Sequence, residues 1–74
     1  MEQILEILRD LHENVDFENR TDLFDSEIID SFDVVSIIAE IEDVFGVVIT
    51  ADLIKPENFN SAKAIWQLVE GLMK

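Results

Sequence analysis

The sequence contains no cysteine, one proline and two glycines among its 74 residues. Without cysteine, no disulfide or thiolate metal site can staple the fold, so its stability must come from packed apolar side chains. The hydrophobic content of 49% makes such a core possible. No run reaches the length of a membrane span, and the N-terminus lacks the basic region and apolar core of a signal peptide. We therefore expect one domain over residues 1–74, cytoplasmic and monomeric, with no metal site and no direct membrane insertion.

Basic residues are also scarce, and their distribution is uneven. Five Lys and Arg face 17 acids, which gives a formal net charge of −12. This balance argues against nucleic acid and anionic membrane surfaces as partners, because both attract basic footprints. A solvated surface explains the number of acids, but it does not explain the lack of any base between Thr21 and Ile54. Partners with basic patches would be steered to that region, which carries nine acids: Asp22, Asp25, Glu27, Asp30, Asp33, Glu40, Glu42, Asp43 and Asp52.

The apolar spacing predicts helices over residues 2–13 and 31–45, a short turn of helix over 51–54 closed by Pro56, and a last helix starting at Asn60-Ser61. Gly46 ends the second helix. The expected fold is all-α: a small four-helix bundle of three long helices and one short one. The core stripes are Ile4, Ile7, Leu8 and Leu11; Val34, Ile37, Ile38, Ile41 and Phe45; and Ala62, Ile65, Val69 and Leu72, with Trp66 at the edge.

The periodicity fails between residues 14 and 29, which predicts a long connection between the first two helices. Connections of this length are uncommon in compact domains and are usually functional. We expect Leu23, Phe24 and Ile28 to anchor it in the core, with its acids outside. Its similarity to a calcium-binding loop is superficial, because the required glycine and ligand spacing are both missing.

Ser31 stands at the predicted start of the second helix. Asp30 is a suitable N-cap residue, and Asp33 adds negative charge where the helix dipole is positive. Ser31 is then expected at the first helical position, with its hydroxyl presented to solvent. His12, the only histidine, is expected to be exposed at the end of the first helix. A hydrolase built on Ser31 and His12 would lack a nucleophile elbow and an oxyanion loop.

A second, weaker strip lies beside the core stripe of the helix predicted over residues 31–45, and it consists of Phe32, Val35, Ser36 and Ala39. Its members could pack against neighbouring loops, but together with the flanking acids they favour a docking surface for partner proteins. The residues expected to bind partners are Asp30, Phe32, Asp33, Val35, Ser36, Ala39, Glu40, Glu42 and Asp43.

Two runs, Leu23-Phe24-Asp25-Ser26-Glu27-Ile28-Ile29-Asp30-Ser31-Phe32 and Ile41-Glu42-Asp43-Val44-Phe45-Gly46-Val47, resemble the acyl carrier protein family. The resemblance covers essentially the whole chain. It implies that Ser31 carries 4′-phosphopantetheine, attached by a separate phosphopantetheinyl transferase. It also implies that the arm's thiol holds an acyl or aminoacyl group as a thioester, loaded by a ligase or synthase with a basic docking patch. The carrier itself would not be an enzyme, in line with a serine that has no histidine near it in the sequence.

The sequence departs from the family pattern at three positions. Phe32 stands where most acyl carriers have leucine, and Ser36 stands where fatty-acid carriers are often acidic. The Asp-Ser-Phe motif is similar to that of the D-alanyl carrier proteins of teichoic acid modification, although those tend to have glycine where Glu27 stands. Three functions therefore stay open: an acyl carrier of fatty-acid, polyketide or related biosynthesis, a D-alanyl carrier, and an acidic adaptor without a prosthetic group.

Overall fold

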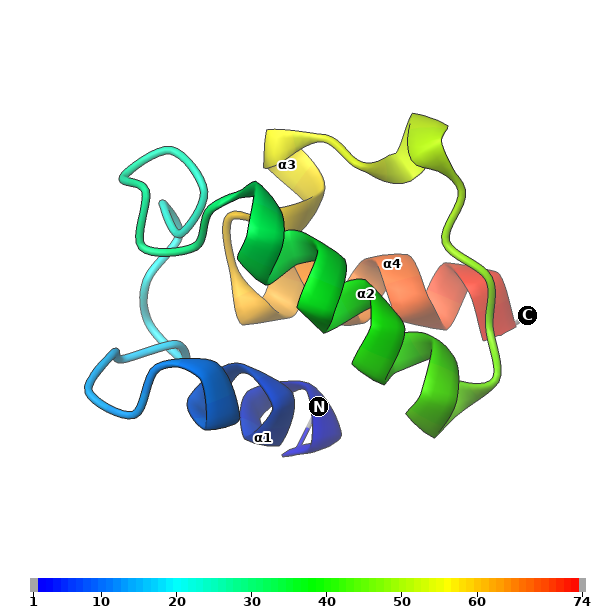
Figure 1. The fold of residues 1–74 in the computed structure, drawn as a ribbon, viewed down its shortest axis with the longest axis horizontal. Coiled ribbons are helices and arrows are strands. Elements are labelled where there is room, and N and C mark those ends of the chain that lie inside the picture. The colour runs from blue at the N-terminus through cyan, green and yellow to red at the C-terminus, as the bar shows by residue number, and fades with distance from the viewer. Residues whose placement is uncertain (1, 74) are drawn as a thin grey trace.

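The computed structural model describes residues 2–73, and its regular elements are helical. The α-helices are α1 (Glu2–Leu11), α2 (Ser31–Phe45), α3 (Pro56–Phe59) and α4 (Ala62–Met73), and a 3-10 turn covers Ala51–Leu53. Figure 1 shows α2 crossing in front of α4, with α1 below and the short α3 above. Contacts join α4 to each of the other three helices. The predicted all-α bundle, with a long connection between its first two helices, is confirmed.

The core forms where α1, α2 and α4 turn their apolar stripes toward each other. Burying one such aliphatic side chain contributes roughly 1.5–3 kcal/mol relative to leaving it in water. At the edge of this core, the rings of Phe45 and Trp66 meet with their centroids 5.9 Å apart. Four residues of the predicted stripes are only half-buried: Leu11, Ile38, Phe45 and Leu72. The buried stripe residues are Ile4, Ile7 and Leu8 from α1, Val34, Ile37 and Ile41 from α2, and Ala62, Ile65 and Val69 from α4. Leu5 of α1, which was not expected in the core, is buried as well.

The connection between α1 and α2 is fastened to the junction of α3 and α4 by Asn60. The backbone oxygen of Asn60 accepts from Leu23 N at 2.9 Å, and its side-chain Oδ1 accepts from Phe24 N and Asp25 N, both at 3.0 Å. Leu23 is fully buried, as predicted, whereas Phe24 and Ile28 are half-buried. Phe17 and Ile29, which were not expected as anchors, are also buried. This fastening holds the segment that leads into Ser31.

Two helix boundaries differ from the sequence prediction. The first helix ends at Leu11 rather than at residue 13, after which no apolar residue continues the core stripe until Val15. The short α-helix lies at Pro56–Phe59, whereas residues 51–53 form only a 3-10 turn. Pro56 begins the helix instead of closing the previous turn, because proline suits the first helical position, where its fixed φ fits and no N–H is needed.

Candidate functional site

A reciprocal pair of hydrogen bonds fixes the start of α2. Asp30 is the N-cap residue and has extended backbone geometry; its Oδ1 accepts from Asp33 N at 2.9 Å. Asp33 Oδ2 in turn accepts from Asp30 N at 3.3 Å, which completes a capping box. At the other end, Gly46 takes the left-handed conformation (φ 67°) that commonly ends a helix. The predicted cap at Asp30 and the predicted helix end at Gly46 are confirmed. Asp33, which was expected to interact with the helix dipole, also accepts a hydrogen bond from Asp30 N.

Ser31 is the first residue of α2 and is exposed, as expected. Among residues 2–73, no acceptor bonds the backbone N–H of Ser31 or of Phe32. Free N–H groups at the positive end of a helix dipole favour an anion such as a phosphate. The hydroxyl and two available amide donors therefore lie together at one exposed helix end.

The other serines differ from Ser31 in what their hydroxyls do. Ser26 Oγ donates to Asp22 O at 2.7 Å, and Ser61 Oγ accepts from Ala64 N at 3.0 Å at the start of α4. Ser36 is exposed on α2, but it lies in the middle of the helix, where the backbone amides are already used by the helix itself. Ser31 is thus the serine that combines exposure with a free helix N-terminus.

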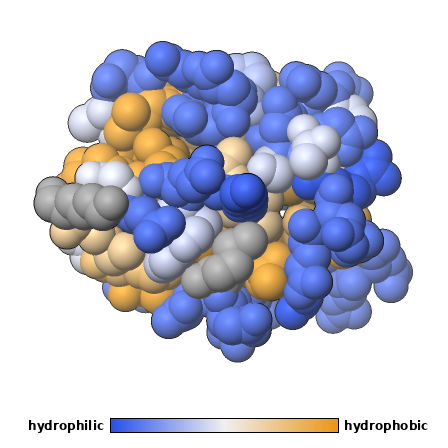
Figure 2. Space-filling model, turned by 180° about the vertical axis from the view of Figure 1, so that it is seen from behind, coloured by the Kyte–Doolittle hydropathy of each residue, from blue (hydrophilic) through white to orange (hydrophobic). Residues whose placement is uncertain are grey.

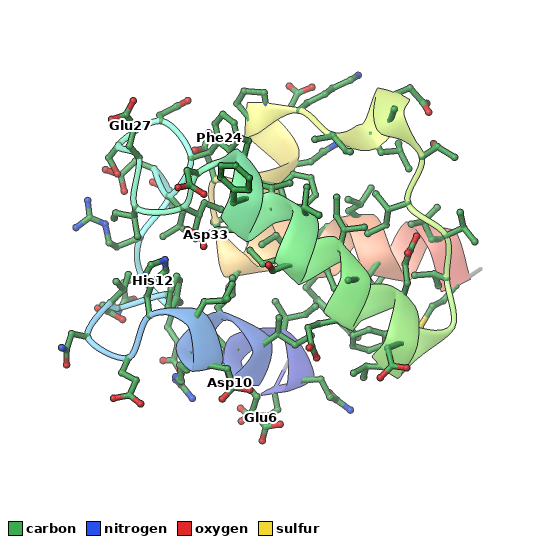
Figure 3. All side chains as sticks on the ribbon, viewed as in Figure 1. Glu6, Asp10, His12, Phe24, Glu27 and Asp33 are labelled. Atoms are coloured by element: carbon green, nitrogen blue, oxygen red, sulfur yellow. The ribbon has the colours of Figure 1, made fainter. Side chains whose placement is uncertain are left out.

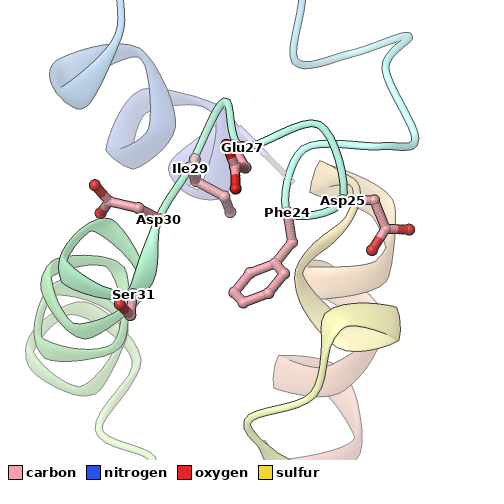
Figure 4. Close-up of a pocket in the computed structure, with 6 residues that line it drawn as sticks. All are labelled: Phe24, Asp25, Glu27, Ile29, Asp30 and Ser31. Carbon is pink, nitrogen blue, oxygen red and sulfur yellow. The ribbon is translucent and has the colours of Figure 1, made fainter.

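A pocket of about 610 Å³ opens beside Ser31 (Figure 4). Figure 4 shows Asp25 and Asp30 pointing outward on opposite sides, with Glu27 on the loop between them. Glu27 has a φ of 61°, a left-handed conformation that non-glycine residues rarely adopt. The lining residues are Phe24, Asp25, Glu27, Ile29, Asp30 and Ser31. The loop before α2 therefore forms one wall of a hollow next to the presented hydroxyl.

The second apolar strip of α2 faces solvent. Phe32 is 83% exposed and Val35 is 64% exposed, so the alternative in which they pack against neighbouring loops is wrong. Ser36, Ala39, Glu40 and Asp43, which share this face with them, are exposed as well. The structure thus places six of the nine residues expected to bind partners on one open surface next to Ser31.

Asp33, by contrast, is tied into the fold. His12 Nε2 lies 3.0 Å from Asp33 Oδ2, and Figure 3 shows the imidazole pointing from the end of α1 toward the start of α2. The two side chains are 37% and 23% exposed. The expectation that His12 would simply be exposed at the end of the first helix is wrong, because this contact spans 21 positions of sequence and depends on how α1 packs against α2.

Glu42 is also held within the protein. Its Oε2 accepts from Ile49 N at 3.1 Å, which fastens the connection after α2 back onto the helix. Asp30, although exposed, uses its carboxylate for the helix cap. Three of the acids expected to bind partners, Asp30, Asp33 and Glu42, therefore also hold the local structure.

Three of the five bases, Arg9, Arg20 and Lys55, pair with acids outside α2. Arg20 forms a two-pronged contact with Asp22, with Nε–Oδ1 at 3.0 Å and Nη2–Oδ2 at 2.9 Å. This hydrogen-bonded pairing raises the pKa of the Arg20 guanidinium and lowers the pKa of the Asp22 carboxyl. The other ion pairs with a Lys or Arg in the part of the chain that the structure describes are Arg9–Glu18 and Lys55–Glu57. None of them neutralises the acids on the exposed face of α2.

Exposed apolar side chains also occur away from Ser31. Seen from behind, hydrophobic surface gathers near the C-terminal end of α4 (Figure 2). Val44, Val48 and Met73 are among the large apolar residues with exposed side chains. Within residues 2–73, no helix combines the length and apolar character needed to cross a membrane.

The hydroxyl of Ser31 is exposed, but within residues 2–73 no base is hydrogen-bonded to it. His12 is engaged with Asp33, and among residues 2–73 no side chain is hydrogen-bonded to Ser31 Oγ. A serine without a neighbouring base is a weak nucleophile. The arrangement therefore suits a serine that another enzyme modifies.

Comparison with known families gives one result that bears on this site. The family model described as "Phosphopantetheine attachment site" matches residues 2–69, which include every residue of the α2 surface. Neither the curated proteins nor the solved structures contain a match to the chain.

Proposed function

The chain belongs to the phosphopantetheine attachment-site family of carrier proteins, and on this premise we propose that Ser31 is the attachment residue. A carrier of this kind holds 4′-phosphopantetheine and performs no catalysis itself. It is served by a phosphopantetheinyl transferase, which adds the arm, and by enzymes that load it. The observation that carries the assignment is the exposed Ser31 at the capped start of α2, where the backbone N–H groups of Ser31 and Phe32 have no acceptor within residues 2–73.

The residues of this chain have a limited part in the modification. Ser31 Oγ forms the new bond to the phosphorus of the phosphopantetheine donor, and the donor's leaving group departs with the electrons of the broken P–O bond. The hydroxyl proton passes to a base of the transferase, since His12 is engaged with Asp33. The N–H groups of Ser31 and Phe32 can donate to the phosphate oxygens once the bond has formed. When attached, the arm supplies the thiol on which cargo is held as a thioester.

The exposed face of α2 is the proposed docking surface for the transferase and the loading enzymes. It combines apolar contact area from Phe32 and Val35 with the charges of Glu40 and Asp43, which form no ion pair within residues 2–73. Partners with basic patches suit this surface, because opposite charges accelerate encounter and fix orientation. Asp30, Asp33 and Glu42 border the same face and add to its negative potential while they hold the backbone.

For the cargo, we propose an acyl or aminoacyl group delivered to enzymes of fatty-acid, polyketide or related biosynthesis. D-alanine, delivered for teichoic acid modification, is the second candidate, favoured by the Asp-Ser-Phe motif at residues 30–32. Mass spectrometry of the carrier isolated from its own cells, with the thioester intact, distinguishes the two by the mass of the attached group.

The experiment that tests the attachment residue is intact-mass measurement after incubation with a broad-specificity transferase and its donor. The wild-type chain should gain the mass of one phosphopantetheine group, and Ser31→Ala should gain nothing. Ser36→Ala, which removes the other exposed serine of α2, is the matched control and should be modified normally. Circular dichroism should show the same helix content in all three. Modification of Ser31→Ala would overturn the assignment, and an unmodified wild-type chain would favour the adaptor without a prosthetic group.

A further inference from the structure

His12 reaches the start of α2 from outside it. Its backbone N donates to Leu8 O at 3.1 Å, so its position is set by the last turn of α1. Because an ionised carboxylate can only accept, the imidazole Nε2 donates to Asp33 Oδ2. The pair is partly shielded from water, with exposed fractions of 37% and 23%. It joins the end of α1 to the first turn of α2, two residues from Ser31.

One oxygen atom links this contact to the helix cap. Asp33 Oδ2 accepts both from His12 Nε2, at 3.0 Å, and from Asp30 N, at 3.3 Å. The position of the Asp33 carboxylate therefore controls one of the two bonds of the capping box, the one that holds Asp30 N just before Ser31. On the other side, Asn60 fastens Leu23 and Phe24 near the beginning of the same segment. The segment before α2 is thus held at Asn60 on one side and at His12 on the other.

We propose that His12 is a positioning residue for the modification of Ser31. By holding the Asp33 carboxylate in place, it keeps the N-terminal turn of α2 closed and presents the Ser31 hydroxyl and the neighbouring N–H groups in one arrangement to the transferase. Without this contact, the carboxylate is free to turn toward water, and the first turn of α2 opens more often. This inference rests on the proposed attachment at Ser31 and assigns a role to a histidine outside the docking surface.

The test compares His12→Ala, His12→Gln and Arg9→Ala in steady-state modification by the transferase. Glutamine keeps a neutral N–H donor at the end of a side chain of similar reach. Arg9→Ala is the matched control, since it breaks the pair between Arg9 of α1 and Glu18 of the following connection, at 3.2 Å, without touching α2. We expect His12→Ala to lower kcat about threefold to tenfold with little change in KM, because the docking surface is intact. His12→Gln should recover most of the loss, and Arg9→Ala should behave like the wild type.

Hydrogen exchange provides a readout that a general loss of stability would not reproduce. The N–H groups of Asp30 and Asp33 both donate within the capping box, so they should exchange faster in His12→Ala. The N–H of Ile65 in α4, which donates to Ser61 O at 3.1 Å, should keep its relative protection. Equal loss at all three amides, or unchanged kcat in His12→Ala, would overturn the role of His12 while leaving attachment at Ser31 in place. Modification that persists in Ser31→Ala would overturn the attachment, and with it this inference.

Discussion

The acids at the start of α2 and the acids along its outer face have the same chemistry but different environments. Asp30 and Asp33 bond backbone N–H groups, and Asp33 also accepts from His12. Glu40 and Asp43 lie on the exposed face and bond no donor within the described residues. The comparison shows that the acids of one strongly negative helix differ in what they contact. The acids at its start fix the backbone around Ser31, and those on its outer face are exposed, where we propose that partners dock.

Reversing the charges on the outer face of α2 should have the largest effect of the changes that compare these two groups of acids, and the effect should be on the rate of modification. Glu40→Lys combined with Asp43→Lys should lower kcat/KM of modification by about tenfold or more at low salt, since steering by charge changes association rates by such factors. Stability should change little, because neither side chain holds the backbone. Steady-state kinetics at several salt concentrations check this, and the difference from wild type should shrink as salt screens the charges.

The matched control for that experiment is Glu6→Lys combined with Asp10→Lys on α1. Their replacement gives the same change in net charge, and Figure 3 shows both exposed acids on α1, below Asp33. If both double variants slow modification equally, net charge and not the face of α2 would govern the encounter.

Removing a cap carboxylate should have the next largest effect, and on stability. Asp30→Ala should lower the free energy of unfolding by about 1 kcal/mol, the usual result of losing an N-cap side chain. Asp43→Ala, on the outer face of the same helix, should stay within about 0.5 kcal/mol of wild type. Urea unfolding followed by circular dichroism measures both, and equal losses in the two variants would remove the distinction between the two groups of acids.

The sequence predicted those features of α2 that depend on residues close to each other along the chain. The cap at Asp30, Ser31 as the first helical residue, the stop at Gly46 and the exposed strip at Phe32 and Val35 all follow from residues within one or two helical turns of each other. The contacts that fix the first turn are not local. His12 lies 21 positions from Asp33, and Asn60 lies 36 positions from Phe24.

Such pairings depend on how the helices pack, and the pattern of apolar residues does not specify them. The same holds for Glu42, whose bond to Ile49 N requires the chain after Gly46 to fold back along α2. Pro56 illustrates a different reason. A proline is compatible both with the end of one turn and with the start of the next helix, and only the structure shows that α3 begins there.

The smallest expected effect is on stability in acid, and it concerns Asp22, which lies outside α2. Pairing with Arg20 lowers the pKa of Asp22 in the folded protein, so this carboxylate contributes stability above its unfolded pKa. That contribution is lost as the pH falls through the folded pKa. Asp22→Asn should therefore make the fall of the melting temperature in acid slightly shallower, and the difference should be small because the pair is exposed. Thermal melts from neutral pH into acid check this; a steeper fall in the variant would contradict it.

The most direct test of the account is fragmentation mass spectrometry of the carrier purified from its own cells, which locates the modified residue within the peptide spanning the start of α2. The account predicts one phosphopantetheine group, attached to Ser31. A group found instead on Ser26, Ser36 or Ser61, or a native protein that carries none, would contradict it.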